Sequence, residues 1–394
     1  MKYPITPDFI GNAPEPLVEL MEQLEEDILK YICSQFQRGS ANETALEYIR
    51  LLQRRGLPLN EIEKRIRKAT GLTRKQMNKI FDGAINRNQA FFNDVLTKMK
   101  LVFSKTRKKA LQAEIAALTK QAGTEVFNIT QSLGFAIRNA DGSITFSPIA
   151  DAYQKVLNKA EVAIWSGAFD YNTAIKNAVK ELTDSGLQTI DYASGWHNRV
   201  DVAARRAIMT GITQISAKYT DTLMEELETP YLEVTAHRGA RDIDGHKGWE
   251  NHKKWQGKIY STHRGDKYPD VHEACGLGDV AGLCGANCRH LYHAFVPEIM
   301  EPTYTQEELD DLDPPPFEFE GRQYTMYEAT QKQRQLETGI RNIKRRMISF
   351  KDAGLDDDYT AAAAKLRALV TKYNDFSEAA DLKPQFNRTQ VQGF

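Results

Sequence analysis

The amino-acid sequence predicts a mainly α-helical protein that carries one small α+β module. Apolar residues recur at every third or fourth position over long stretches, which is typical of amphipathic helices. By contrast, ten of the twelve histidine and cysteine residues lie between His237 and His293, in a glycine-containing stretch with few long periodic runs. We therefore expect short strands and loops around one helix in this stretch, and helices in most of the remaining chain.

The length and composition are those of a globular protein with two or three domains. The chain has 394 residues, of which 41% are hydrophobic and 27% charged, and its net charge is -1. A net charge this close to zero gives no overall electrostatic attraction to nucleic acid or anionic lipid. Any such contact therefore needs a local patch of basic residues. No apolar run approaches the roughly eighteen residues that span a bilayer, and the N-terminus does not resemble a secretory signal. We expect no membrane partner, synthesis in a reducing cytoplasm, and cysteines that are thiols or ligands.

The first 227 residues are predicted to be a helical region with one β-hairpin. The hairpin is expected at 135–146, where two short alternating runs flank Asp141 and Gly142. Apolar spacing predicts the helices, and Pro230 ends the last of them. Their expected ranges are about 15–38, 43–55, 59–70, 74–122, 148–184 and 198–227.

Three further segments follow this helical region. Residues 228–300 form the predicted Cys/His-rich α+β module, which begins with a strand at 231–236. Residues 301–321 are acidic and proline-rich, which is typical of a linker or an extended arm. Residues 322–394 contain two apolar seams with four-three spacing around a turn at 354–358, so we expect a C-terminal helical hairpin.

The clustered cysteines and histidines raise the question of a metal site. Zinc needs four nitrogen or sulfur ligands in tetrahedral geometry, but the spacing C-x8-C-x3-C-x-H-x2-H lacks the tight pairs of most structural zinc sites. The alternative is that the thiols fill apolar gaps and the imidazoles bind backbone groups. We expect no other cofactor, and a structural zinc ion remains open, most simply around Cys284, Cys288 and one of the last two histidines. The candidate ligands are Cys275, Cys284, Cys288, His290 and His293.

Two segments of the module resemble a known family. HKKWQGKIY at 252–260 and GLCGANCRH at 282–290 resemble the paired signatures of phage minor capsid proteins of the minor capsid protein 2 type, which are related to MuF-type head-morphogenesis proteins. The resemblance is best over about 198–300, and it is compositional only over the first 197 residues. Its signature residues are His252, Trp255, Gln256, Gly257, Gly282, Asn287, Cys288, Arg289 and His290.

This resemblance implies a structural virion protein that acts by binding. Such a protein is expected inside the capsid near the portal, in several copies around it. Its implied partners are the portal protein, the major capsid protein or other head proteins, and the phage genomic DNA. The helical region over residues 1–227 is the part expected to dock on the portal or capsid, through the helix faces at 17–36 and 200–223. The family supplies no settled catalytic residue, so we expect no enzyme activity.

Two other functions stay open from the residues. His246 and His252, with Asp244 and Asn251 nearby, could form the active site of a metal-dependent nuclease or of a toxin-like hydrolase carried in the particle. A scaffolding protein that is lost before maturation is the other alternative.

Several side chains have two interpretations each. Arg289 is interpreted as a clamp on the glycine-rich turn, with phosphate binding as its alternative, and Trp249 and Trp255 as core anchors. A basic stretch could contact DNA or could be an ordinary solvated helix face. It consists of Lys98, Lys100, Lys105, Arg107, Lys108 and Lys109.

Overall fold

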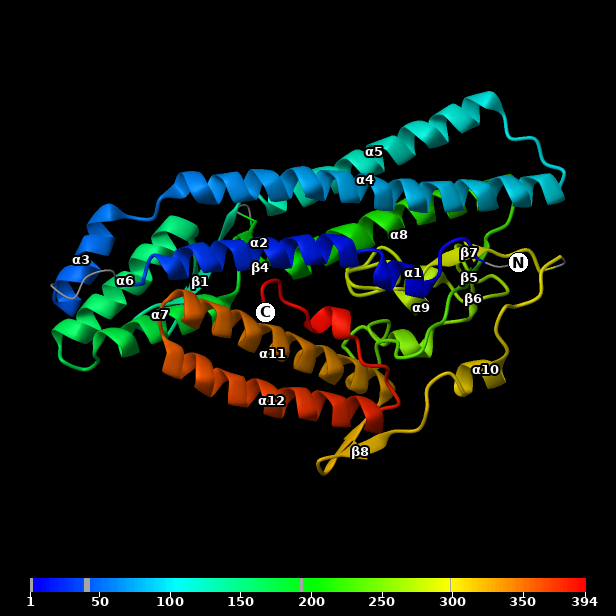
Figure 1. The fold of residues 1–394 in the computed structure, drawn as a ribbon. Coiled ribbons are helices and arrows are strands. Elements are labelled where there is room, and N and C mark those ends of the chain that lie inside the picture. Colours follow the sequence, from blue (N-terminus) through cyan, green and yellow to red (C-terminus); the bar gives the residue numbers. More distant parts are fainter. Residues whose placement is uncertain (1–2, 39–42, 192–193, 298) are drawn as a thin grey trace. The chain divides into compact units, whose positions relative to one another are not determined.

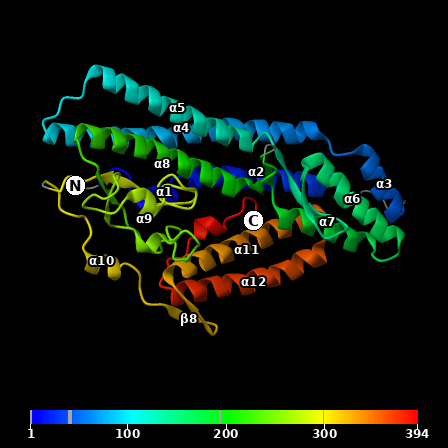
Figure 2. The same ribbon diagram turned by 180° about the vertical axis from the view of Figure 1, so that it is seen from behind.

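The computed structural model describes residues 3–38, 43–191, 194–297 and 299–394, and it confirms the predicted fold class. Helices predominate, and the strands form three small sheets within these ranges (Figure 1 and Figure 2). No helix in these ranges is long and apolar enough to cross a membrane.

The chain divides into two compact units, each of which combines three stretches of sequence. Unit 1 comprises Met1–Leu17, Arg74–Val126 and Ala204–Thr330, and unit 2 comprises Val18–Thr73, Phe127–Ala203 and Gln331–Phe394. The segment boundaries predicted at 227, 300 and 321 do not coincide with these limits. The predicted 228–300 module lies wholly inside unit 1.

Unit 1 contains most of α4 (Leu59–Lys98), α5 (Lys105–Ile129) and α8 (Val200–Glu226), together with the short α1 (Pro7–Asn12). The three long helices pack closely where Gly211 of α8 faces α4 and α5. A Cβ atom at Gly211 would lie 2.8 Å from the Phe81 ring and 2.9 Å from the Ala122 side chain. The absent side chain therefore allows α8 to approach both neighbours.

The expected unbroken helix over 74–122 is wrong, as is a separate helix over 59–70. α4 runs without interruption from Leu59 to Lys98, and the chain then turns over residues 99–104 before α5. Lys100 has a left-handed φ of 54°, and the Leu101 amide donates to the Leu96 carbonyl at 2.9 Å. This is a helix C-terminal turn closed by backbone hydrogen bonds, a geometry that apolar periodicity does not reveal.

The Cys/His-rich module of unit 1 is a three-stranded antiparallel sheet with short helices. The strand order is β6 (Ile259–Ser261), β5 (Tyr231–Val234), β7 (Tyr292–Ala294), so the strand predicted at 231–236 is confirmed. Its described residues include the short α-helix α9 (Val271–Cys275) and a 3₁₀ turn, η1, over His252–Lys254. Thr220 of α8 donates to the Tyr292 carbonyl at 3.2 Å, which joins the sheet to that helix.

The acidic, proline-rich segment carries little regular structure, as the sequence predicts. It forms the single turn α10 (Gln306–Asp310) and a two-stranded hairpin of β8 (Phe317–Phe319) and β9 (Arg322–Tyr324). Its side chains are mostly exposed. One of its carboxylates, Asp313, accepts from the Gly239 amide at 2.7 Å and so fixes the segment to the module.

Unit 2 contains the predicted hairpin in a four-stranded sheet. The order is β2 (Ile144–Pro148), β1 (Leu133–Arg138), β3 (Gln188–Ile190), β4 (His197–Arg199), and Ala136 pairs with Phe146. α6 (Ile149–Trp165) and α7 (Tyr171–Ser185) both contact β1. The helix expected over 148–184 is thus divided in two, because Gly167 has a φ of 74° and the Asp170 side chain caps α7.

The C-terminal helical hairpin is confirmed in unit 2. α11 (Met326–Asp352) and α12 (Asp356–Ala379) lie side by side in both views of the ribbon (Figure 1 and Figure 2). Gln333 donates to Ser377 at 3.1 Å, and the Tyr373 hydroxyl donates to Glu337 at 3.1 Å. The residue number increases along α11 while the number of its partner on α12 decreases, so the two helices run antiparallel. Unit 2 also contains most of α2 (Glu15–Ser34), α3 (Ala45–Arg55), the turn η2 (Phe386–Thr389) and the first part of α4.

A buried ion cluster joins α2 to α11 within unit 2. The Arg345 side chain is 1% exposed and lies 3.4 Å from Glu25 and 3.6 Å from Glu26. Arg341 lies 3.0 Å from Glu22, and Arg199 extends the cluster with a contact of 3.0 Å to Glu25. Burial raises the pKa of both Glu22 and Glu26 to about 7, although the arginines oppose this shift.

Candidate functional site

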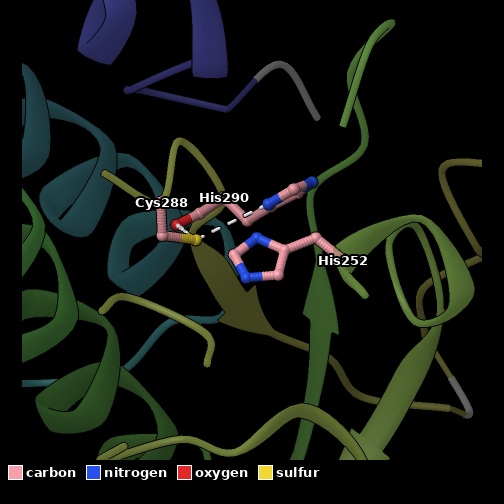
Figure 3. A group of neighbouring side chains, drawn as sticks. All are labelled: His252, Cys288 and His290. Atoms are coloured by element: carbon pink, nitrogen blue, oxygen red, sulfur yellow. Dashed lines mark hydrogen bonds between the residues drawn. The ribbon is translucent and has the colours of Figure 1, made fainter. Parts of the chain in front are cut away.

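One cluster of metal-ligating residue types forms in the described part of the chain. His252, Cys288 and His290 each place one nitrogen or sulfur atom within 4.8 Å of the other two (Figure 3). They are 2%, 2% and 1% exposed. His252 comes from the turn η1, and the other two residues come from the loop that leads into β7. The two signature segments of the sequence are therefore brought together in unit 1.

The glycine-rich loop takes its shape from close backbone packing. A Cβ atom at Gly282 would lie 2.2 Å from the Gly276 carbonyl oxygen and 2.7 Å from that of Cys275, so only glycine fits there. Further along, Cys284 and Asn287 adopt left-handed φ values of 62° and 58°. These tight turns bring Cys288 and His290 back over the module core.

Arg241 holds this loop in place. Its guanidinium donates to the Ala281 carbonyl at 3.1 Å and to the Ala286 carbonyl at 3.2 Å. The sequence assigned a clamping role to Arg289, whose Nη2 atom lies 3.1 Å from Nδ1 of His237. That role stays a prediction, and Arg241 is a second clamp, which the sequence analysis did not identify.

Hydrogen bonds orient both imidazole rings of the cluster. His252 Nε2 lies 2.9 Å from the Ala281 carbonyl oxygen, and His290 Nε2 lies 3.1 Å from Oε1 of Gln256. The opposite nitrogen of His290, Nδ1, lies 3.5 Å from Cys288 Sγ. Figure 3 shows the sulfur and this nitrogen facing each other beside the His252 ring.

Burial shifts the acid–base equilibria of the cluster toward uncharged forms. It lowers the pKa of His252 to about 4 and that of His290 well below its usual value. It also raises the pKa of the Cys288 thiol to about 11. Near neutral pH these shifts favour two neutral imidazoles and a protonated thiol.

The structure brings together two of the five predicted metal ligands and places a third beside them. Cys288 and His290 belong to the cluster, and the Cys284 and Cys288 thiols both lie 3.8 Å from the His290 carbonyl oxygen. His252 joins the cluster although spacing alone did not suggest it as a ligand. Its place in the first signature segment, paired with the second segment, is the signal that could have identified it.

The other two predicted ligands, Cys275 and His293, are not among the three residues whose donor atoms lie within 4.8 Å of one another. Cys275 ends α9 inside the apolar core of the module, next to Tyr260. His293 follows Tyr292 on β7, so its side chain leaves the opposite face of the strand, where its ring stacks on Tyr3 at 3.9 Å. His293 is only three residues from His290, so sequence distance alone would allow both to bind one ion. The alternation of side chains along β7 points His293 away from the cluster instead.

The residues suggested for a nuclease do not converge. His246 is exposed, whereas His252 is buried and donates to a backbone carbonyl. The Asn251 side chain donates to Asp242 at 3.0 Å and to Asp244 at 3.1 Å. These hydrogen bonds hold the local turn together, which gives Asn251 and Asp244 a structural role. Among the described residues, His246 is not part of the ligand cluster.

The two tryptophans are structural, as predicted. Trp255 is 3% exposed in the module core, and its Nε1 donates to the Trp249 carbonyl at 2.8 Å. Trp249 is half-buried against the same core and lies close to Gly276, where a Cβ atom would be 2.4 Å from its ring. Gly257, another signature residue, has a φ of 70° and faces Leu309 of α10.

The predicted basic stretch lies at the end of α4, the connection and the start of α5, and all six side chains are exposed. Lys98 pairs with Asp94 at 2.7 Å, and Arg107 pairs with Glu225 and Glu226 at 2.8 and 2.7 Å. Within the described ranges no ion pair is seen for the remaining four, Lys100, Lys105, Lys108 and Lys109.

Comparisons with known proteins agree with the resemblance. The model of a family described as phage minor capsid protein 2 matches residues 5–378. A curated protein named "Structural protein", from Lactococcus phage LL-H, is 25% identical over 301 residues, which cover 71% of this chain and 74% of that protein. No solved structure matches the chain.

Proposed function

Because this chain belongs to the phage minor capsid protein 2 family, we propose that it is a structural protein of the phage head that acts at the portal vertex, inside the capsid. In this proposal several copies surround the portal protein and contact the major capsid protein or other head proteins. The protein is made in the host cytoplasm and remains in the virion. The observation that carries the proposal is the family match, which includes parts of both units.

The proposed mode of action is binding and not catalysis. The signature residues serve the module's own architecture: Gly282 permits a backbone contact, Trp255 fills the core, and Gln256 orients a buried histidine. The buried cluster offers neutral side chains and no exposed acid–base pair. A plasmid-nicking assay with Mg²⁺, Mn²⁺ or Zn²⁺ checks this part, and cleavage that depends on His246 or His252 would contradict it.

The apolar faces of α2 and α8 cannot be the docking surface in this folded state, because their residues form the cores of the units. Leu17, Met21, Ile208 and Ile212, for example, are all at most 1% exposed. We propose instead the 162–169 patch, defined as Val162, Trp165 and Phe169, which are 64%, 73% and 45% exposed. The first two lie one helical turn apart near the end of α6, and Phe169 follows in the connection to α7.

Replacing Trp165 and Val162 by serine is expected to abolish co-purification with the portal protein of the same phage, without loss of folding. Truncating well-exposed apolar side chains removes little from the core but removes apolar area from an interface. The measurement is a pull-down with tagged portal protein, together with circular dichroism. Phe386→Ser is the matched control, because Phe386 is 59% exposed on η2 of the same unit.

The location is tested in the assembled particle. Mass spectrometry of purified mature virions should detect the protein, and a cryo-EM map should show several copies around the portal. Absence from mature particles would support the scaffolding alternative instead. Even distribution over the capsid shell would contradict the portal assignment.

We also propose that the basic stretch contacts packaged DNA. The logarithm of the DNA-binding constant falls linearly with the logarithm of the salt concentration. Changing Lys100, Lys105, Lys108 and Lys109 to alanine should make this negative slope shallower by roughly 3 to 4, since each lost phosphate contact reduces its magnitude by about 0.9. Fluorescence anisotropy with duplex DNA at several salt concentrations measures this slope. A control variant with alanine at Lys30, Lys351, Lys365 and Lys383, which are also exposed, carries the same charge change. Equal slopes for the two variants would reject the assignment.

A further inference from the structure

We propose that unit 1 contains a structural Zn²⁺ site in which His252, Cys288 and His290 are ligands and Cys284 supplies the fourth donor. The site is independent of the proposed head location, because it concerns how the module itself is held together. The three side chains that carry the proposal are shown in Figure 3.

The tautomer of His252 leaves its Nδ1 atom available as a ligand. Its Nε2 atom lies 2.9 Å from the Ala281 carbonyl oxygen, which can only accept a hydrogen bond. The proton of the neutral ring therefore belongs on Nε2, and Nδ1 carries the lone pair. In Figure 3 this nitrogen faces the space beside Cys288 and His290.

The tautomer of His290 is fixed in the same way through Gln256. Oε1 of Gln256 accepts from the backbone amide of His237 at 3.0 Å, so this atom is the amide oxygen and not the nitrogen. It lies 3.1 Å from His290 Nε2, which must therefore donate. Two separate carbonyl groups thus turn two imidazole lone pairs toward one sulfur atom. Such outer hydrogen bonds are what orient metal-binding histidines in proteins.

The separations suit a tetrahedral zinc ion. Donor atoms that lie about 2.0–2.3 Å from zinc in tetrahedral geometry are roughly 3.5 Å from each other. Cys288 Sγ and His290 Nδ1 are 3.5 Å apart, and the three donor atoms lie within 4.8 Å of one another. Any separation near the 4.8 Å limit would shorten toward about 3.5 Å when the ion binds.

Cys284 is the proposed donor for the fourth position. Its thiol and that of Cys288 both lie 3.8 Å from the His290 carbonyl oxygen. Cys284 has a left-handed φ of 62° and lies in the tight loop four residues before Cys288. Two thiols and two imidazoles form a donor set that selects zinc over magnesium or calcium, which prefer oxygen.

A bound cation would join two parts of the module. Zinc binds cysteine as the thiolate, so a divalent cation would displace the protons of both thiols and neutralise both thiolates. It would also link η1 to the loop before β7, in a module whose apolar core is small.

The test begins with the full-length wild-type protein. After dialysis against excess Zn²⁺ and then metal-free buffer, elemental analysis should find one zinc ion per chain. Replacement by Co²⁺ should give the visible bands of a tetrahedral site and a near-ultraviolet thiolate-to-cobalt band. Absence of bound zinc, or a cobalt spectrum without the thiolate band, would overturn the proposal and leave a neutral hydrogen bond between Cys288 and His290.

Variants assign the ligands. Cys288→Ala and His252→Ala should abolish the tetrahedral cobalt spectrum, whereas Cys284→Ala should reduce the thiolate band by about half and weaken zinc binding. Cys275→Ala and His293→Phe are the matched controls, because both residues are buried in the same unit outside the cluster. Retention of the full band in Cys284→Ala would reject Cys284 as the fourth donor. Loss of zinc from both controls as completely as from Cys288→Ala would reject the ligand set.

Gln256 provides a test that leaves all four ligands in place. Gln256→Ala removes the oxygen that orients His290 and should lower zinc affinity about 10–100-fold. Gln256→Glu keeps an acceptor oxygen and should restore most of that affinity. Zinc affinities are measured by competition with a chromophoric chelator. Equal affinities for the wild type and both variants would contradict the positioning role.

Discussion

Gly282→Ala is expected to destabilise the Cys/His-rich module by about 3 kcal/mol or more, the upper range of overpacking effects. The new methyl carbon would lie 2.2 Å from the Gly276 carbonyl oxygen and 2.7 Å from the Cys275 carbonyl oxygen. Both are backbone atoms, so no flexible side chain can move aside. The loop itself must shift, and it carries Cys288 and His290. Hydrogen exchange over residues 259–294, compared with the wild type, measures the effect.

Gly83→Ala is the control for this substitution. Gly83 lies inside α4, and a Cβ atom there would meet nothing within 4 Å. Alanine should therefore stabilise α4 by about 0.5–1 kcal/mol, because it is the better helix former. If Gly282→Ala were as well tolerated as Gly83→Ala, the close contact between the loop and α9 would be wrong.

Arg345→Met is expected to destabilise unit 2 by about 3–5 kcal/mol at pH 8, the usual cost of removing one partner of a buried ion cluster. The methionine fills similar volume but leaves Glu25 and Glu26 without this counter-charge in a buried position. Urea unfolding combined with hydrogen exchange in α2 and α11 should locate the loss in this unit.

The deficit of Arg345→Met should shrink as the pH falls from 8 to about 5.5. Burial already raises the pKa of Glu22 and Glu26 to about 7, and removing a nearby cation raises it further. A carboxyl group whose pKa is higher in the folded state contributes stability below its unfolded pKa and loses it as the pH rises through the folded value. Acidic conditions therefore neutralise Glu22 and Glu26, which reduces the uncompensated negative charge around position 345.

Arg346→Met, at the adjacent position, is the matched control. Arg346 pairs with Asp184, whose side chain is 62% exposed, so its loss should cost at most about 1 kcal/mol. Comparable effects for the two variants, or an Arg345→Met deficit that does not depend on pH, would contradict the buried-cluster interpretation.

Features with a local cause could be predicted from the sequence. The hairpin around Gly142, the strand that follows Pro230 and the antiparallel pair α11 and α12 all depend on turn residues and apolar spacing, and all three are confirmed. Helix ends were less predictable. The break at 99–104 relies on a left-handed Lys100 and backbone hydrogen bonds, neither of which has a strong residue preference.

The sequence by itself determined the fold class and the family, because helical periodicity and two short signatures are properties of consecutive residues. Tertiary structure alone decided which stretches form each unit and which side chains meet. His252 lies 36 positions before Cys288 yet shares its cluster, whereas His293 lies only three positions after His290 and leaves it. The reason is geometric: strand alternation turns neighbouring side chains to opposite faces, and packing brings distant loops together.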